Sequence, residues 1–385
     1  MDQGLLTLSF SEVAKGLSLS VTQITLIPSK TSSNPETFTL SSSTTVQESK
    51  NSRVFVLVLS ETDLNAVSTS GNLATDKPKT FITISASLIA DMSNNPVTSI
   101  TDTSALPVSK FTKDTTPPTV LKFALDLDAG TMTLNFDETV NVASINFSAF
   151  TLSVAPSTVA EAYTLTDSSS SNVNAIQTIV TLGANDLYNL KANLQLTTSR
   201  GDAFLSHLAD AFQDMAGNNA YAVSLDDAVQ ASLYTRDSSQ VSIHAVSLDM
   251  ASGVLSIDFV EPVLAYTLNL GAVKLQPASD ARDFNIYAIN TSNVSSAMDS
   301  LITVQLSNYD LNQLKVRLIG HVNQTYITMD GGAIKDTANN TNVPLLNGVN
   351  ALLVDSSYFD SITNQTIENV VADKERPFVD SFSFD

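Results

Sequence analysis

The chain has 385 residues, of which 43% are hydrophobic, a formal net charge of −20 and no cysteine. The acidic balance argues against nucleic-acid binding because it repels phosphate backbones, and the lack of cysteine excludes thiol nucleophiles and cysteine-ligated metals. The length exceeds what one core usually covers, and no apolar run reaches the about 20 residues of a membrane-spanning helix, so we expect several domains and no membrane span in this segment.

The first predicted element is a β-hairpin that occurs three times along the chain. In the second copy, residues 128–130 predict a tight turn, and the alternation of Met132, Leu134 and Phe136 predicts a strand with one buried face. In each copy a Gly is followed six residues later by Phe and eight residues later by Glu, giving Gly4, Phe10 and Glu12, then Gly130, Phe136 and Glu138, then Gly253, Phe259 and Glu261.

An apolar strand and a short helix follow in each copy. Residues 54–59 and 302–306 illustrate the predicted strands, and Asp63, Asp186 and Asp310 come shortly after a strand of this kind. Because Asp is a common N-cap residue, we expect each of these to cap one or two helical turns.

The next recurring landmark is a tight turn that opens with an aspartate. Gly or Asn stands at its fourth position, and both tolerate a left-handed backbone, so we expect a positive φ there. The aspartates are Asp91, Asp214 and Asp336, and the fourth residues are Asn94, Gly217 and Asn339. A further aspartate marks the end of each copy, at Asp114, Asp237 and Asp373.

The constant order of these landmarks predicts a tandem array. Short alternating strands between turns rich in Ser, Thr, Asn, Asp and Gly favour an all-β fold of three Ig-like antiparallel β-sandwich repeats, each about 123–136 residues long. We expect a longer parent protein and an insertion around residues 356–372. The predicted boundaries are 1–115 for repeat 1 without its first strand, 116–238 for repeat 2, 239–374 for repeat 3, and 375–385 for the first strand of a following repeat.

Three short motifs carry a family resemblance. The junction at residues 117–120, the strand at 135–140 and the turn at 214–218 together resemble the bacterial-type Ig-like repeats of S-layer and adhesin proteins. Similar repeats occur in large extracellular surface and flagellar-hair (mastigoneme-like) proteins of algae and protists. The resemblance implies a non-enzymatic module of a stalk, coat or filament, located outside the cell, whose partners are neighbouring repeats or copies of the same protein.

Catalytic chemistry has little support in the sequence. The three histidines, His207, His244 and His321, lie in different parts of the repeat, and no Gly-rich phosphate loop or nucleophile elbow is present. We therefore expect no catalytic residue and no enzyme. The alternative function is cell adhesion or carbohydrate binding through loops at one end of a sandwich, with surface glycans as partners. The chain has no Trp and only nine Tyr, so aromatic side chains on which a sugar could stack are scarce.

Carboxylates offer a candidate calcium site at the junctions. Calcium takes six to eight oxygen ligands, and an ion bound between repeats would stiffen the array. The residues concerned are Glu138, Asp214, Asp237, Glu261, Asp336 and Asp373. In the alternative interpretation each Asp caps its own turn and each Glu is solvated, so that no cofactor is required.

Two further hypotheses concern modification and assembly. N-glycosylation sequons begin at Asn146, Asn290, Asn293, Asn323, Asn339 and Asn364. Residues 376–385 resemble the first strand of a repeat, so they could pair with the first copy of another molecule and form a head-to-tail polymer. The alternative is that the chain is simply one stretch of a longer array.

Overall fold

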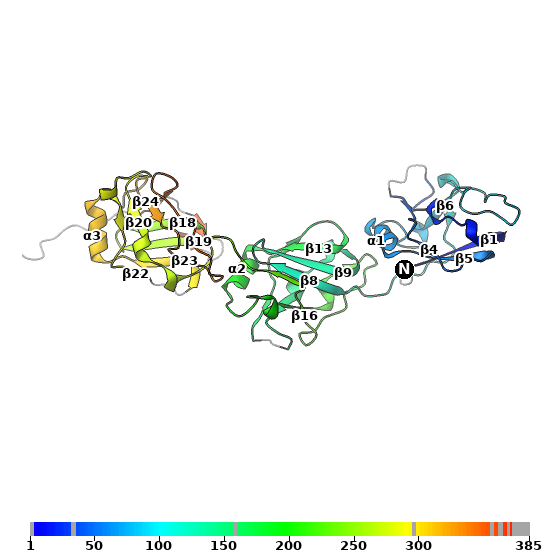
Figure 1. The fold of residues 1–385 in the computed structure, drawn as a ribbon, viewed down its shortest axis with the longest axis horizontal. Helices are drawn as coiled ribbons and strands as arrows, with labels where there is room; N and C mark the ends of the chain where they lie inside the picture. Colours follow the sequence, from blue (N-terminus) through cyan, green and yellow to red (C-terminus); the bar gives the residue numbers. More distant parts are fainter. Residues whose placement is uncertain are drawn as a thin grey trace, which may run out of the picture.

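The computed structural model describes residues 4–31, 36–157, 160–294, 298–354, 358–360, 365–367 and 370–371. Over these residues the protein is built from short β-strands in mainly antiparallel sheets, with three α-helices. The strands form three successive units that lie in a row along the long axis (Figure 1). The predicted fold class, an all-β array of antiparallel β-sandwiches, is confirmed.

Each unit contains two sheets and one helix. The first unit has sheets ordered β1-β5-β4 and β3-β2-β6-β7. Its elements are β1 (Leu5–Ala14), β2 (Ile24–Ile27), β3 (Phe38–Thr39), β4 (Thr45–Val46), β5 (Ser52–Val58), α1 (Glu61–Thr69), β6 (Phe81–Ile84) and β7 (Leu106–Pro107).

The second unit repeats this order and adds strands at the sheet edges. Its sheets are β12-β13-β9-β8-β17, with β15 paired to β9, and β11-β10-β14-β16. The elements are β8 (Val120–Asp126), β9 (Thr131–Asn141), β10 (Phe150–Ser153), β11 (Ala162–Thr164), β12 (Ser169–Ser170), β13 (Ala175–Thr181), α2 (Ala184–Ala192), β14 (Phe204–His207), β15 (Gln213–Asp214), β16 (Val229–Gln230) and β17 (Leu233–Thr235).

The third unit has sheets ordered β18-β19-β23-β22 and β21-β20-β24-β25. A small hairpin, β26 with β27, falls within the predicted insertion. The elements are β18 (Ile243–Asp249), β19 (Val254–Leu264), β20 (Val273–Gln276), β21 (Tyr287–Ala288), β22 (Asn293–Val294), β23 (Met298–Gln305), α3 (Asn308–Val316), β24 (Tyr326–Met329), β25 (Leu352–Leu353), β26 (Tyr358–Asp360) and β27 (Gln365–Ile367).

Short 3₁₀ turns connect many of these strands. In the first unit they are η1 (Gly16–Ser18), η2 (Val21–Gln23), η3 (Lys77–Lys79) and η4 (Asp102–Ser104). In the second they are η5 (Val142–Ser144), η6 (Phe147–Ala149), η7 (Arg200–Asp202) and η8 (Ala209–Ala211), and in the third η9 (Ala265–Thr267), η10 (Leu270–Ala272) and η11 (Asp283–Asn285).

A separate hydrophobic core lies between the two sheets of each unit. In the second unit Met132 and Leu134 of β9 face Phe150 and Leu152 of β10, and all four side chains are fully buried. The alternation along β9 places its apolar residues on the inner face, as the sequence predicts. The buried residues of the three cores span 8–89, 120–231 and 241–370. The predicted boundaries at 115 and 238 lie between these spans and stay predictions, and residues 375–385 lie outside the described residues.

The predicted turns have the expected backbone. Asn94, Gly217 and Asn339 have φ values of 68°, 85° and 66°. The hairpin glycine Gly130 has φ of 63°, and a Cβ on it would lie 3.1 Å from Leu187 of α2. Glycine at this position therefore permits both the left-handed turn and the close approach of the helix.

The prediction that Asp63, Asp186 and Asp310 cap the helices is wrong. The N-cap residues are Ser60, Gly183 and Ser307, and each aspartate is the third helical residue and is buried. Asp186 accepts hydrogen bonds from the Thr166 backbone (2.7 Å) and the Ser168 hydroxyl (2.6 Å), among others. The aspartate thus fixes the loop that precedes β12 to the helix, a role that depends on tertiary contacts rather than on local sequence.

The edge of the first unit differs from that of the other two. Among the described residues β1 is the outermost strand of its sheet, whereas β9 and β19 pair on that side with β8 and β18. Hydrogen-bonding groups along β1 are thus available to another strand.

Candidate functional site

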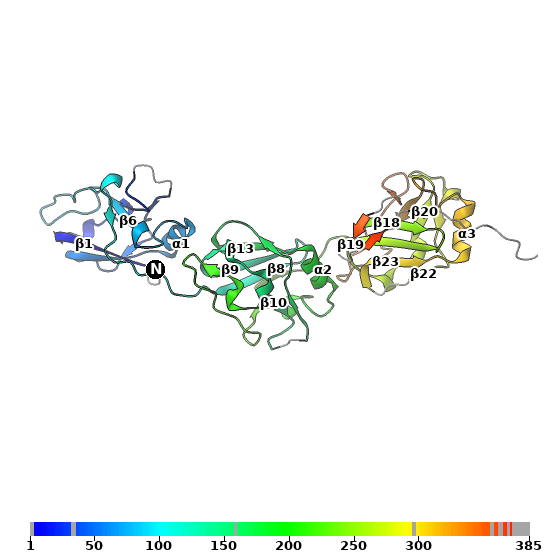
Figure 2. The ribbon, with the colours of Figure 1, turned by 180° about the vertical axis from the view of Figure 1, so that it is seen from behind.

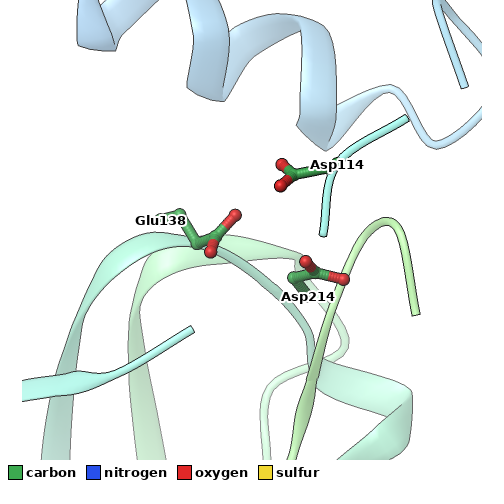
Figure 3. Close-up of side chains that lie close together, drawn as sticks. All are labelled: Asp114, Glu138 and Asp214. Carbon is green, nitrogen blue, oxygen red and sulfur yellow. The ribbon is translucent and has the colours of Figure 1, made fainter. Parts of the chain in front are cut away.

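The first candidate site is a group of three carboxylates between the first and second units. Asp114 lies in the connecting segment, Glu138 in β9 and Asp214 in β15. Their carboxylates point toward one another beneath one end of a helix (Figure 3), and one oxygen from each lies within 4.8 Å of the others. We call this group the first triad.

The local fold holds the Asp214 carboxylate in place. Asp214 is 2% exposed, and its Oδ1 accepts hydrogen bonds from the backbone N–H groups of Ala216 and Asn218, both at 2.8 Å. The Asn218 amide donates to Asp214 Oδ2 at 2.6 Å and to the Asp114 carbonyl at 3.2 Å. The turn therefore connects two members of the first triad.

The close approach of three carboxylates in the first triad changes the pKa of Glu138. Burial, together with the charges of Asp114 and Asp214, raises the pKa of Glu138 to about 8. A carboxyl group with such a pKa is largely protonated at neutral pH, and a bound cation would return it to the charged form.

The corresponding residues meet again between the second and third units. Asp237, Glu261 and Asp336 are all buried, and one oxygen from each lies within 4.8 Å of the others. Asn340 repeats the role of Asn218, since its amide donates to Asp336 Oδ2 at 2.8 Å and to the Asp237 carbonyl at 3.1 Å. We call this group the second triad.

A lysine from α2 enters the second triad. Lys191 Nζ lies 2.7 Å from Asp237 Oδ2 and 2.5 Å from Glu261 Oε2, and its side chain is 10% exposed. Burial alone would lower the pKa of Lys191, but its bonds to Asp237 and Glu261 outweigh that effect and raise it. Lys191 is therefore held in its charged form between two carboxylates.

Three carboxylates still outnumber one ammonium in the second triad. Burial raises the pKa of Glu261 to about 7 even though Lys191 opposes the shift. Burial and the charge of Asp237 likewise raise the pKa of Asp336. The second triad therefore takes up protons near neutral pH despite its internal cation.

The predicted calcium ligands thus fall into two groups. Glu138 and Asp214 lie together with Asp114, and Asp237, Glu261 and Asp336 lie together with Lys191. Asp373 lies outside the described residues. Sequence reasoning missed Lys191, because its helix position alone does not mark it as a member of the site. The eighth helical residue is Ser68 in α1, Lys191 in α2 and Lys315 in α3.

Further contacts join the second and third units. Tyr188 of α2 donates a hydrogen bond to Asp299 at 2.9 Å, and Thr337 donates to the Lys191 carbonyl at 2.6 Å. Between the first and second units, Thr139 donates to Asn65 Oδ1 at 3.1 Å. In both places the helix of one unit contacts the long strand of the next, α1 with β9 and α2 with β19.

Neither triad includes a histidine. His207 is buried between Phe150 and Phe212, with ring centroids 5.7 and 5.2 Å away, and burial lowers its pKa. His244 Nδ1 lies 3.1 Å from Asp258, and His321 is exposed in a turn. These three environments differ from one another and share no common site.

The sequon asparagines occupy different surroundings. Asn146 is half-buried and its side chain accepts a hydrogen bond from Ser148. Asn290, Asn293, Asn323 and Asn339 are exposed. Asn364 lies outside the described residues. Glycosylation of these residues stays a prediction, and the exposed four offer the better access to a transferase.

Comparisons with known proteins add little to this description. No protein-family model matches the chain, and no curated protein matches it. A solved structure titled "Marsupial T cell receptor" shares 10% sequence identity, and the match covers 84% of this chain and 90% of that chain with a TM-score of 0.15. A likeness this distant carries no argument. No helix among the described residues has the length and apolar character needed to cross a membrane.

Proposed function

We propose that this chain is a non-enzymatic structural module of an extracellular stalk, coat or filament, assembled from tandem Ig-like repeats of S-layer or adhesin type. The observation that carries the proposal is the recurrence of one joining pattern. Asn218 donates to the Asp114 carbonyl at the first junction, and Asn340 donates to the Asp237 carbonyl at the second. Units joined by a repeated contact add length in one direction, as the row of three in Figure 2 illustrates.

Two measurements test this function. Small-angle scattering of the purified chain should give a maximum dimension close to three sandwich lengths placed end to end. An antibody raised against the chain should label intact, unpermeabilised cells of the source organism. Labelling only after permeabilisation, or a compact particle in solution, would contradict the proposal.

Head-to-tail assembly is part of the same proposal. Among the described residues no strand pairs with the outer edge of β1, and the sequence of residues 376–385 resembles that of β8, which covers the equivalent edge of β9. Light scattering should show a concentration-dependent increase in mass that disappears when 376–385 are deleted. An unchanged mass distribution after the deletion would eliminate this mode of assembly.

Carbohydrate binding or adhesion is the second candidate function. An open depression on the first unit is lined mainly by hydroxyl side chains, including Thr25, Thr39 and Thr83. Hydroxyl groups can exchange hydrogen bonds with a sugar, but they give no stacking surface. Binding of the chain to a glycan on an array, and loss of that binding in Thr83→Val, would favour this function.

A further inference from the structure

The two triads are the same arrangement with one difference in charge. Each combines an aspartate from the connecting segment, a glutamate from the long strand and an aspartate from the tight turn. At the second triad a cation is present in the form of the Lys191 ammonium group. At the first triad the equivalent helix position, in α1, holds Ser68, whose hydroxyl carries no charge.

In the second triad two of the three carboxylates, those of Asp237 and Glu261, hold a cationic group. Their oxygens approach a positive centre to 2.5 and 2.7 Å. Because the first triad is built from the same elements and tied by the same Asn-to-carbonyl bond, the geometry that accepts a cation is present there too.

The dimensions of the first triad suit a single metal ion. Calcium–oxygen distances are about 2.3–2.6 Å, so two ligands on one ion lie at most about 5 Å apart. The three carboxylate oxygens lie within 4.8 Å of one another, which is inside that limit. Two of the three residues are only half-buried, which leaves room for the waters that complete a calcium shell.

Turn capping by Asp214 does not exclude coordination. A carboxylate has four lone pairs, two on each oxygen. The backbone donors occupy both on Asp214 Oδ1 and the Asn218 amide occupies one on Oδ2, so one lone pair of Oδ2 stays open to an ion. The hydrogen bonds from Ala216 and Asn218 instead fix the carboxylate in one orientation. Such support by neighbouring donors is typical of metal ligands in proteins.

We propose that Asp114, Glu138 and Asp214 bind one calcium ion, and that this ion occupies at the first junction the place that the Lys191 ammonium occupies at the second. Calcium is the chemical class expected because every ligand is an oxygen and the site lies between two separately folded units. The proposal goes beyond the structural function, since an ion could bind here whether or not the chain forms a filament.

Isothermal titration of the full chain with calcium chloride tests the proposal. The wild type should bind one equivalent, with a dissociation constant in the range of about 10⁻⁴–10⁻³ M that extracellular modules show. Glu138→Gln, which keeps the shape of the side chain, should weaken binding by about tenfold or more.

Glu261→Gln is the matched control, because it makes the same change at the triad that Lys191 already occupies. It should leave the calcium affinity of the wild type unchanged. The proposal is overturned if the wild type binds no calcium at about 10 mM, which is roughly ten times the weakest dissociation constant expected. It is equally overturned if Glu138→Gln binds as the wild type does, or if Glu261→Gln removes the site.

Discussion

At the scale of single residues, the buried aspartate in each helix is a main determinant of stability. Asp310 is fully buried and accepts hydrogen bonds from the Thr291 backbone at 3.0 Å and the Ser292 hydroxyl at 2.6 Å, with Tyr287 as a third donor. Burial alone would raise the pKa of Asp310, but these donors outweigh it and lower the pKa to about 2.

We predict that Asp310→Asn destabilises the third unit by about 2–3 kcal/mol, the usual value of hydrogen bonds to a charged group. The folded pKa is depressed, so the stabilisation is complete above the unfolded value of about 4 and is lost as pH falls toward about 2. Urea denaturation at pH 7 and at pH 3 measures both effects.

Asp283→Asn provides the control for this prediction. Asp283 is exposed in a 3₁₀ turn of the same unit, so its substitution should change stability by less than about 0.5 kcal/mol. An equal loss in the two variants would show that charge, and not the hydrogen-bonded anchor, matters.

The same residue scale shows what a sequence can and cannot reveal. The positive φ at Asn94, Gly217 and Asn339 could be predicted because it depends on the residue type and on its immediate neighbours. The role of Asp186 could not, because its donors come from a loop that only the folded sandwich brings to the helix. Lys191 was missed for a related reason, since its partner Glu261 is 70 residues away in the next unit.

At the scale of elements, α2 carries the cation that partly offsets the charge of the second triad. Lys191→Ala would leave three buried carboxylates without their counter-charge, and removing one partner of a buried pair usually costs about 3–5 kcal/mol. Glu261 has its pKa raised to about 7 by burial, so protonation relieves part of this cost at low pH. The loss of stability in Lys191→Ala should therefore be larger at pH 8 than at pH 5.

Lys315→Ala is the control for the helix, because Lys315 occupies the equivalent position of α3 and is exposed. Thermal melts of both variants at the two pH values make the comparison. A similar, pH-independent shift in both would contradict the assigned role of Lys191.

The exchange between lysine and calcium makes an element-scale prediction of its own. Ser68→Lys should place an ammonium at the end of α1 and supply the first triad with an internal cation. We expect calcium binding at that junction to weaken by about tenfold or more, as for loss of a ligand. Titration calorimetry measures the affinity, and Ser68→Gln, which adds length without charge, is the control that should retain calcium.

At the scale of the whole molecule, the first junction should respond to pH and calcium together. Burial and the charges of Asp114 and Asp214 raise the pKa of Glu138 to about 8. For a carboxyl group with a raised folded pKa, stability is highest below the unfolded value of about 4.5 and declines as pH rises toward 8.

We therefore predict that, without calcium, melting of the chain begins at lower temperature at pH 8.5 than at pH 5. Calcium should raise the melting onset much more at pH 8.5, because it competes with protons for the same carboxylate. Differential scanning calorimetry with calcium or with a chelator measures this. If calcium raised the melting onset equally at the two pH values, the ion would not be bound by Glu138.

The repeat organisation and the main strands could be predicted from the sequence, because the same spacing of residues recurs along the chain. Met132, Leu134 and Phe136 alternate as a half-buried strand must, and the same spacing returns in each copy. The assembly of the triads could be anticipated only in part, since carboxylates from a connecting segment, a strand and a turn meet where two units touch.

The difference between Ser68 and Lys191 has a mechanical consequence. A lysine joint carries its own charge and needs no bound ion, whereas a calcium joint loosens when the ion is withdrawn. In calcium-poor water the chain would behave as a stiff pair of units with one hinged neighbour, and its persistence length would fall at that single point. A long array could thus encode, with one side chain per repeat, where it bends and where it stays straight.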